Sequence, residues 1–370
     1  MSRVQPDFDI LSGKRKDRPA ELLRWALSLA SLPYLVGTEL RHFAFNSGLL
    51  PVRAVDVPVI SIGNLTTGGT GKTPTVAWLV QQLLKAGLKP GIVSRGYQAL
   101  SEAENDEKRL LSSMFPEVPH EQQPDRRAAA RRLLSNTSSN VIVLDDGFQH
   151  RRLHRDLDLV LIDTLNPWGY GHLLPRGLLR ERMAHLSRAD AIFLTRCDLA
   201  APEQLQQIEH KIAQVASAHV YRTAFRPRGW INSSGDRLPL HGLPPEPVIA
   251  FCGIGNPDGF EKTLAGCLTQ PVLQMVTFPD HHHYCSGDFR RLKLLAGRSH
   301  VHTLVTTCKD LVKLPQQRTA GLEIWALEIG LEPQGDLTPL QQQLQILFPE
   351  QPFHLTAPAE TPATSDNTTS

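Results

Sequence analysis

Cysteine is scarce in this sequence, and its few copies follow no pattern that builds a site. The 370 residues contain five cysteines, an odd number, and no two of them form a C-x-x-C pair. This argues against a disulfide framework and against a cysteine-built zinc site, and it favours a reducing cytoplasm.

Excess charge of one sign is also missing. The 39 Lys and Arg residues nearly balance the 37 Asp and Glu residues, which leaves a net charge of +2. This balance excludes a globally basic nucleic-acid binder, so we expect no nucleic-acid partner, although a local basic patch is compatible with it. The hydrophobic fraction of 41% and the charged fraction of 21% are those of a soluble globular protein.

The hydrophobic segment near the N-terminus is too short to cross a bilayer. Its longest uncharged run covers 25–38 and is interrupted by Pro33, whereas a spanning helix needs about 20 apolar residues. We expect no signal peptide either, because the run begins late and no small-residue cleavage site follows it.

The same segment, 21–45, has the periodicity of an amphipathic helix. One helical stripe is polar and the other is apolar: Glu21, Arg24, Ser28 and Ser31 against Leu22, Trp25, Leu29 and Leu32. Basic residues flank it, namely Lys14, Arg15, Lys16, Arg18 and Arg41. Two interpretations stay open: the helix lies in an anionic membrane surface, or it packs on its own domain.

The rest of the chain alternates between strands and helices. Apolar strands are expected at 57–65, 91–95, 140–146, 158–163, 191–196 and 219–225, with helices at 73–86 and around 125–135. Pro and Gly in 226–247 suggest a linker, after which strands resume at 247–255, 271–278, 302–307 and 322–330. The pattern predicts an α/β fold with a parallel sheet. We divide it into a membrane-docking segment 1–50, a main domain 51–245, a smaller α/β domain 246–354 and a disordered tail 355–370.

A phosphate-binding loop is the strongest single motif. The strand 57–65 leads into Thr66-Thr67-Gly68-Gly69-Thr70-Gly71-Lys72-Thr73 and then a helix, which is the context of a Walker A motif. The main domain is therefore expected to resemble P-loop NTPases. Backbone amides would hold the phosphates of ATP, Lys72 would reach the β- and γ-phosphates, and Thr73 would bind Mg²⁺. Thr66 stands where the usual pattern has glycine.

A second magnesium anchor is expected at the end of the strand VIVLDD. Asp145 and Asp146 close this strand at the carboxyl edge of the sheet, where ligands bind in α/β proteins. The sequence does not decide which of the two carboxylates is nearer the metal.

Arginines are concentrated around this strand. Seven lie between Arg126 and Arg155, with only two acidic residues among them, and Arg180 follows on a loop rich in Gly and Pro. Because the planar guanidinium favours phosphate, we expect Arg126, Arg151 and Arg180 to contact a phosphorylated substrate.

Seven segments occur together in a characteristic order: SIGNLTTGGTGKTPT, SRGY, LDDGFQHRRL, GHLLPRGLLRE, FCGIGNP, FPDHHHY and TTCKDLVKL. Over residues 20–350 the chain resembles the tetraacyldisaccharide 4′-kinase family of lipid A assembly. The resemblance implies transfer of the γ-phosphate of ATP to the 4′-hydroxyl of a tetraacyldisaccharide 1-phosphate. It also implies an N-terminal helix docked on the cytoplasmic face of the inner membrane; no protein partner is expected.

The resemblance also implies roles for individual residues. The catalytic carboxylate of the family matches Asp106, in the pair Asp106-Glu107, and its histidine partner matches His281 after Asp280. The phosphate-loop lysine matches Lys72, and Glu181, beside Arg180, is expected to join the magnesium ligands. The stretch before Asp106 is shorter than the family pattern and lacks its second glycine. The active site would then lie between the two domains, and domain closure would complete it.

Two other classes of function are compatible with parts of the sequence. His281-His282-His283 with Cys285, together with the segment 195–198, suggest a GTP-driven metal-insertion chaperone. Consecutive histidines on a strand point to opposite sides, however, and cannot all face one ion. A P-loop ATPase that positions a protein partner is the other alternative.

Overall fold

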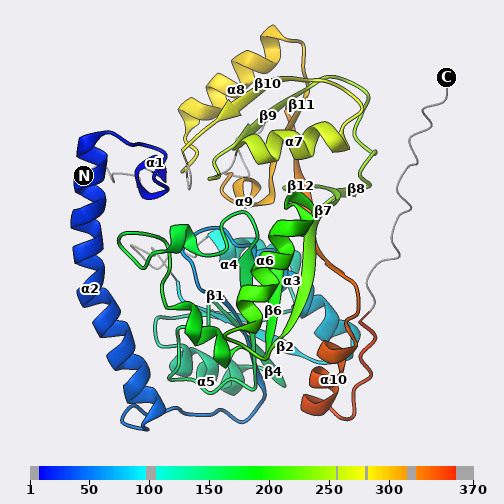
Figure 1. Cartoon of the computed structure of the whole chain (residues 1–370). Helices are drawn as coiled ribbons and strands as arrows, with labels where there is room; N and C mark the ends of the chain where they lie inside the picture. Colours follow the sequence, from blue (N-terminus) through cyan, green and yellow to red (C-terminus); the bar gives the residue numbers. More distant parts are fainter. Residues whose placement is uncertain (1–7, 97–105, 256, 280–281, 315–321, 356–370) are drawn as a thin grey trace, which may run out of the picture.

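The computed structural model describes residues 8–96, 106–255, 257–279, 282–314 and 322–355. Their strands form one mixed sheet in the order β10-β9-β11-β12-β7-β6-β5-β1-β4-β2-β3, and β8 pairs with β7 (Figure 1). In chain order the strands are β1 Val59–Asn64, β2 Pro90–Ser94, β3 His120–Gln122, β4 Val141–Asp145, β5 Leu157–Asp163, β6 Ala191–Thr195, β7 His219–Asn232, β8 Arg237–Leu238, β9 Val248–Cys252, β10 Val272–Thr277, β11 Thr303–Thr307 and β12 Glu323–Gln334.

Helices connect these strands. The α-helices are α1 Phe8–Leu11, α2 Arg18–Asn46, α3 Lys72–Lys85, α4 Asp106–Met114, α5 Arg126–Asn136, α6 Pro202–Ala213, α7 Pro257–Cys267, α8 Ser286–Arg298, α9 Cys308–Leu311 and α10 Thr338–Leu347. Short 3₁₀ turns are η1 Gly169–Gly171, η2 Met183–Arg188 and η3 Cys197–Leu199.

The central strands are parallel and buried. In β1, β4, β6 and β9 every residue is buried, because helices cover both faces of the sheet. β1 pairs in parallel with β4 and β5, and β9 pairs in parallel with β10 and β11. The predicted α/β class with a parallel sheet is confirmed.

Two long antiparallel strands connect the larger and the smaller part of the molecule (Figure 1). β7 and β12 pair from Trp325↔Asn232 to Gln334↔Arg222. The linker expected at 226–247 is therefore wrong for 226–232, which continue β7. The register shifts between Glu328 and Ile329, opposite Gly229 and Pro227. Proline and glycine are tolerated in strands at such bulges, so their presence in the sequence was misread as a linker.

Helix α2 lies along one side of the larger part (Figure 1). Its inner face contacts the protein: Tyr34 Oη donates to the carbonyl of Arg180 at 3.0 Å, and Ser31 Oγ donates to that of Leu173 at 3.2 Å. Its outer face carries seven apolar side chains that are 55% to 73% exposed; we call them the outer stripe: Leu22, Trp25, Leu29, Leu32, Val36, Leu40 and Phe43.

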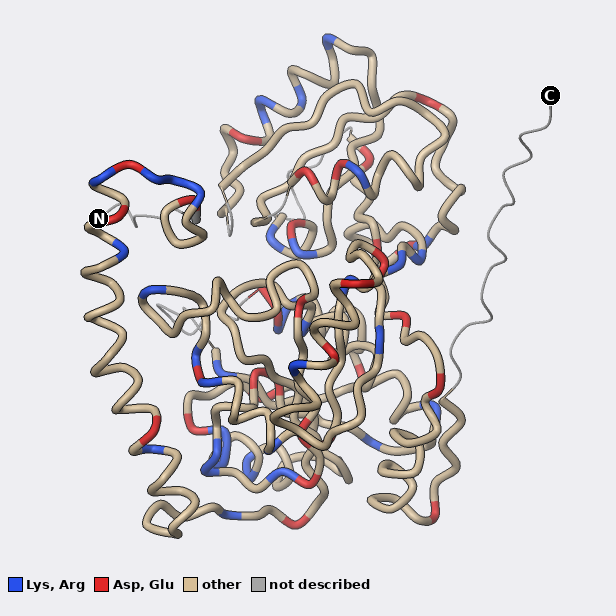
Figure 2. Tube along the Cα trace, in the orientation of Figure 1, with Lys and Arg blue, Asp and Glu red and all other residues tan. Residues whose placement is uncertain are grey.

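The apolar stripe predicted from the sequence is thus the outer face of α2. Of the polar stripe, Arg24, Ser28 and Ser31 are half-buried, whereas Glu21 is exposed. In Figure 2 the middle of the helix is a long stretch without charged residues, and a basic segment at Lys14–Lys16 lies near its N-terminal end. Among the described helices, none is both long and apolar enough to cross a membrane.

Candidate active site

The phosphate-binding loop joins β1 to α3 and is held by polar contacts from its own strand. Asn64 Nδ2 donates to the carbonyl of Thr66 at 2.7 Å and to Thr70 Oγ1 at 2.9 Å. Gly71 precedes the helix with φ of +92°, and a Cβ there would lie 2.0 Å from Cζ of Phe225. Only glycine fits this position. The first amides of α3 therefore point into the loop, as in an anion site.

Asp146 contacts one residue from each of two other motifs. Its Oδ1 lies 3.6 Å from Nζ of Lys72, and Arg180 Nη1 donates to both of its oxygens at 2.9 Å. Burial raises the pKa of the Asp146 carboxyl, but Lys72 and Arg180 outweigh it and hold that pKa below its usual value. Lys72 Nζ also donates to Asn64 Oδ1 at 3.4 Å. The structure thus brings together Lys72, Asp146 and Arg180.

Asp145 has a different environment from its neighbour. It is buried, and its Oδ1 has no hydrogen-bond partner among the described residues. Burial raises the pKa of this carboxyl to about 6, against the opposing charge of Lys72. This buried oxygen without a partner, the carboxylate of Asp146 and the hydroxyl of Thr73 in the first turn of α3 are oxygen donors of the kind that Mg²⁺ prefers. The residues present therefore fit a magnesium ion.

Of the arginines expected to bind substrate, two lie near the paired aspartates. Arg180 faces Asp146 and also donates to Gln149 Oε1 at 3.2 Å. Arg126 begins α5 with a buried side chain whose Nε has no hydrogen-bond partner in the described part of the chain. Burial, and then the like charge of Arg95, lower its pKa to about 10. A buried cation with an unused donor is a candidate anion-binding group.

Arg151 contacts α2. Its Nη1 donates to Nδ1 of His42 at 3.2 Å, its Nη2 donates to Asn46 Oδ1 at 2.7 Å, and its guanidinium lies over the ring of Phe45. These contacts fasten the C-terminal half of α2 to the segment that follows β4. A substrate role for Arg151 stays a prediction.

Asp106 lies where the two parts of the molecule meet. It is the first residue of α4, and its Oδ2 is 3.5 Å from Nζ of Lys313, in the smaller part. Lys313 is 3% exposed and also lies 3.2 Å from Oδ1 of the fully buried Asp310. Asp310 in turn accepts from the amide of Gly253 and from Thr307 Oγ1.

The partner expected for Asp106 cannot be placed. His281 and Asp280 lie outside the described residues. Lys313 and Asp310 belong to the segment TTCKDLVKL, but sequence reasoning gave them no role. Their spacing of three, which puts two side chains on one side of a helical turn, was the available signal.

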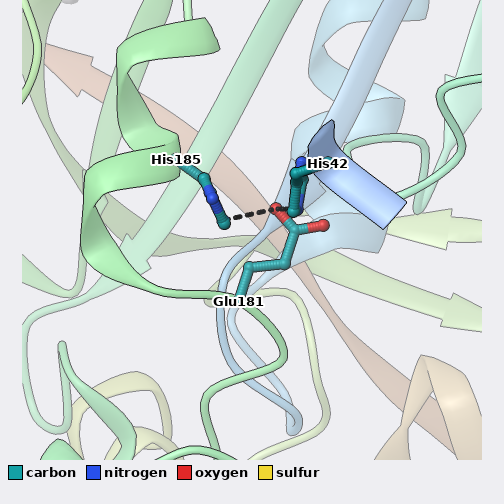
Figure 3. A group of neighbouring side chains, drawn as sticks. All are labelled: His42, Glu181 and His185. Atoms are coloured by element: carbon teal, nitrogen blue, oxygen red, sulfur yellow. Dashed lines mark ion pairs between the residues drawn. The ribbon is translucent and has the colours of Figure 1, made fainter. Parts of the chain in front are cut away.

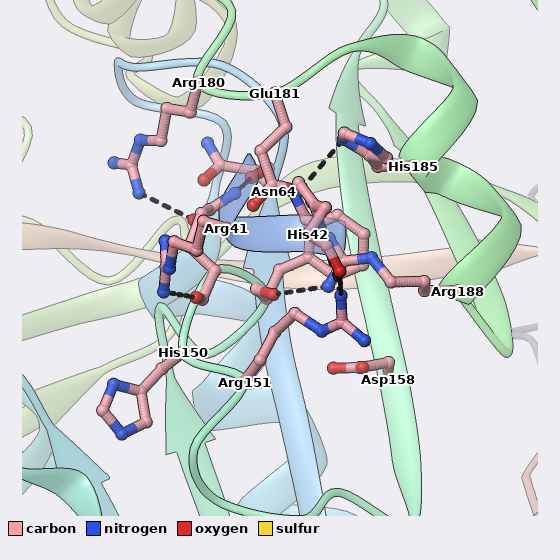
Figure 4. Close-up of polar contacts among 12 residues, drawn as sticks. Arg41, His42, Asn64, His150, Arg151, Asp158, Arg180, Glu181, His185 and Arg188 are labelled. Atoms are coloured by element: carbon pink, nitrogen blue, oxygen red, sulfur yellow. Dashed lines mark hydrogen bonds and ion pairs between the residues drawn. The ribbon is translucent and has the colours of Figure 1, made fainter. Parts of the chain in front are cut away.

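The side chain of Glu181 points in a different direction from that of the preceding residue, Arg180 (Figure 4). Its Oε2 lies 3.3 Å from Nε2 of His42 and 3.7 Å from Nδ1 of His185 (Figure 3). This oxygen also accepts from Arg188 Nη2. Among the described residues, the polar contacts of Glu181 go to His42, His185 and Arg188 and not to Asp145 or Asp146. Its predicted role as a magnesium ligand stays a prediction.

The sheet, the phosphate-binding loop and the paired carboxylates define a P-loop nucleotide-binding protein of the α/β class. The family model described as tetraacyldisaccharide-1-P 4′-kinase matches residues 23–347. The chain belongs to this family.

Individual relatives agree with the assignment. The tetraacyldisaccharide 4′-kinase of Syntrophus aciditrophicus is 36% identical over 352 residues, which cover 87% of this chain and 92% of that protein. That of Anaeromyxobacter dehalogenans strain 2CP-C is 35% identical over 319 residues, 81% of this chain and 84% of that protein. The crystal structure of LpxK from Aquifex aeolicus in complex with ATP superposes with a TM-score of 0.72 at 28% identity, covering 88% of this chain and 99% of that one.

Proposed function

We propose that this protein transfers the γ-phosphate of ATP to the 4′-hydroxyl of tetraacyldisaccharide 1-phosphate, a step of lipid A biosynthesis. The proposal rests on one observation: Lys72 and Arg180 both contact Asp146 beside the phosphate-binding loop. The chain that carries this arrangement belongs to the 4′-kinase family. The family does not favour the metal-insertion chaperone or the protein-positioning ATPase.

Each part of the site has a task in this reaction. The amides of 66–73 and the ammonium of Lys72 bind the triphosphate, while Thr73, Asp145 and Asp146 supply oxygen ligands for Mg²⁺. When bound, the metal ion neutralises charge on the phosphates. Arg126 and Arg180 offer guanidinium groups to the phosphate of the acceptor, whose charge would use the free Nε of Arg126.

A sugar hydroxyl needs a base because it is a weak nucleophile. Asp106 is our candidate to accept its proton, with His281 orienting the carboxylate. The contact between Asp106 and Lys313 supports a site closed by both parts of the molecule. We keep the domain boundary near residue 246 as part of this proposal, since most buried apolar side chains of 248–327 form hydrophobic clusters of their own. Side chains from Leu331 to Leu355, by contrast, pack into the hydrophobic cluster of the larger part.

The outer stripe of α2 supports the proposal that the acceptor lies in a membrane. An apolar helix face with a tryptophan, close to the basic segment Lys14–Lys16, is suited to the interface of an anionic membrane. We propose that α2 rests on the cytoplasmic face of the inner membrane and brings the site to its lipid acceptor.

The test is transfer of ³²P from γ-labelled ATP with Mg²⁺ to tetraacyldisaccharide 1-phosphate in mixed micelles, with product identified by mass spectrometry. We expect phosphorylation by the wild type and a loss of at least a hundredfold in Lys72→Ala. The substitution removes the ammonium group that binds the β- and γ-phosphates. Hydrolysis of ATP without a phosphorylated lipid, or full activity of Lys72→Ala, would overturn the proposal.

A further inference from the structure

Glu181 is a buried carboxylate with more partners than its neighbours in the active site. Its side chain is 2% exposed, and it contacts three side chains from two other elements. These are His42 of α2 and His185 of η2 (Figure 3), and Arg188 of η2 (Figure 4). Burial raises the pKa of this carboxyl, but the hydrogen bond from His42 and the charge of Arg188 outweigh it and lower the pKa. Keeping a carboxylate ionised in the protein interior costs desolvation free energy, which its partners must offset.

The hydrogen bonds around His42 define its protonation. Arg151 Nη1 can only donate, so Nδ1 of His42, 3.2 Å away, is the acceptor. The ring proton therefore lies on Nε2, which donates to Glu181 Oε2. His42 does this as a neutral group, and the charge of Glu181 is matched by Arg188.

The same assignment argues against a metal at this cluster. His42, Glu181 and His185 offer ligand atoms within 4.8 Å of one another, a set that could hold an ion. A metal-bound histidine, however, donates its second ring N–H to an acceptor, whereas the second nitrogen of His42 faces Arg151. Arg188 also occupies the carboxylate. The cluster is therefore a hydrogen-bonded connection between elements.

This connection leads from α2 to the active site by two short routes. Glu181 is the residue after Arg180, whose carbonyl accepts from Tyr34 of α2 and whose amide donates to the carbonyl of Leu65 at the start of the phosphate-binding loop. Arg188 donates to the carbonyl of Phe148, two residues after Asp146, and stacks on its ring at 4.0 Å. Figure 4 shows the side chains of Arg180, Glu181 and Arg188 beside His42 of α2.

We propose that Glu181 is a positioning residue: held by His42 and Arg188, it fixes Arg180 against Asp146 and so couples the docking of α2 to phosphoryl transfer. The proposal rests on the proposed kinase function. Glu181 does not touch the reacting atoms, and it acts through Arg180. The outer stripe and the active site would then be opposite ends of one rigid connection.

The test combines Glu181→Gln with Arg180→Ala in the full-length protein. Glutamine keeps the shape of the side chain but loses the charge that holds Arg188 and His42. We expect a kcat at least tenfold lower for Glu181→Gln, with the KM for ATP changed less than twofold. In the Arg180→Ala background the same substitution should lower kcat less than twofold further, because residues that act as one unit are not additive.

The control is Glu328→Gln, which removes the charge of another little-exposed carboxylate, on β12, paired with Arg237 of β8 at 2.9 Å. It should leave kcat within twofold of wild type, so that loss of an ion pair alone is accounted for. If Glu181→Gln fails to fold, His42→Ala breaks the connection from the α2 side and should show the same pattern.

The outcomes separate the two proposals. Wild-type protein that transfers no phosphate would overturn the function. Active wild type with an equally fast Glu181→Gln, or with losses that multiply in the double variant, would overturn the positioning role alone. An equal loss in Glu328→Gln would also overturn it.

Discussion

Arg126 is one of the residues that we propose to bind the phosphate of the acceptor. Its guanidinium is buried at the start of α5, where the like charge of Arg95 disfavours it and its Nε is unused among the described residues. An arrangement that is unfavourable in the free protein is consistent with a group kept for a ligand, because a bound phosphate would supply the missing acceptor.

Arg126→Met tests this interpretation. A lost charge-assisted hydrogen bond corresponds to about 1.5–3 kcal/mol, so we expect the KM for the disaccharide phosphate to rise roughly tenfold or more, with the KM for ATP unchanged. Arg132→Met is the matched control, since Arg132 lies on the same helix with a side chain 61% exposed. Equal acceptor KM values in the two variants would contradict the assignment.

His120 makes stability depend on pH. Burial, and then the charge of Lys108, lower the pKa of His120 to about 3, from 6.5 in a model peptide. Between these values the unfolded chain binds a proton that the folded protein does not, so stability falls as the pH decreases through this window, by up to about 1.4 kcal/mol per unit.

Urea unfolding at pH 7.5 and pH 5.0 measures this effect. We expect the loss of unfolding free energy between the two pH values to be smaller in His120→Gln than in wild type, by roughly 2 kcal/mol at most. His241→Gln, at an exposed histidine, should match the wild type. Parallel pH dependences for all three proteins would show that His120 is not responsible.

At the residue scale, the sequence predicted which residues belong to the site better than it predicted which of them contact one another. The motif spacing identified Lys72 and the two aspartates, and the structure places Lys72 beside Asp146. It could not rank Asp145 and Asp146, because their difference arises from burial and from Arg180, 34 positions away. It also grouped Glu181 with the metal ligands, since nothing local shows that a carboxylate meets His42 across 139 residues.

At the scale of elements, periodicity was the informative signal. It predicted α2, α3, α5 and most of the buried strands to within a few residues, because each has a local pattern of apolar side chains. The other helices were not named from the sequence. β7 was the exception: its bulge carries the proline and glycine that normally mark a loop, and its length follows from pairing with β12, about 100 residues later.

The outer stripe of α2 allows a direct test of membrane binding. Trp25→Glu places a charge in the apolar face, and burying it in the interface is unfavourable, so we expect sedimentation with vesicles containing anionic lipid to fall severalfold. The matched control is Ile346→Glu, on α10, whose side chain is 77% exposed. Equal loss in both variants, or no loss in either, would show that the outer stripe is not the membrane contact.

At the scale of the whole molecule, one sheet joins two parts that the sequence suggested as separate domains. The antiparallel pair β7 and β12 is common to both, and the contact of Asp106 with Lys313 lies across the junction. The strand order could not be predicted, because pairing between distant strands is not expressed in local composition. The junction is therefore where the candidate base depends on the smaller part.

Lys313 is the residue with which this dependence can be measured. Lys313→Met leaves Asp310 buried without its cation, and breaking such a pair is expected to lower the free energy of unfolding by about 3–5 kcal/mol. Adding Asp310→Asn removes the uncompensated charge and should restore most of that stability. The contact with Asp106 stays lost in both proteins, so the double variant should regain stability without regaining kcat. Lys262→Met, an exposed site on α7, should leave both quantities unchanged.

These two readouts separate stability from catalysis. If kcat recovers together with the unfolding free energy in the double variant, Lys313 only stabilises the smaller part. A kcat that stays low at restored stability means that Asp106 is positioned from across the junction. That result would connect the shape of the whole molecule to a single carboxylate: the sheet holds the smaller part in place, and Lys313 carries its position to the candidate base.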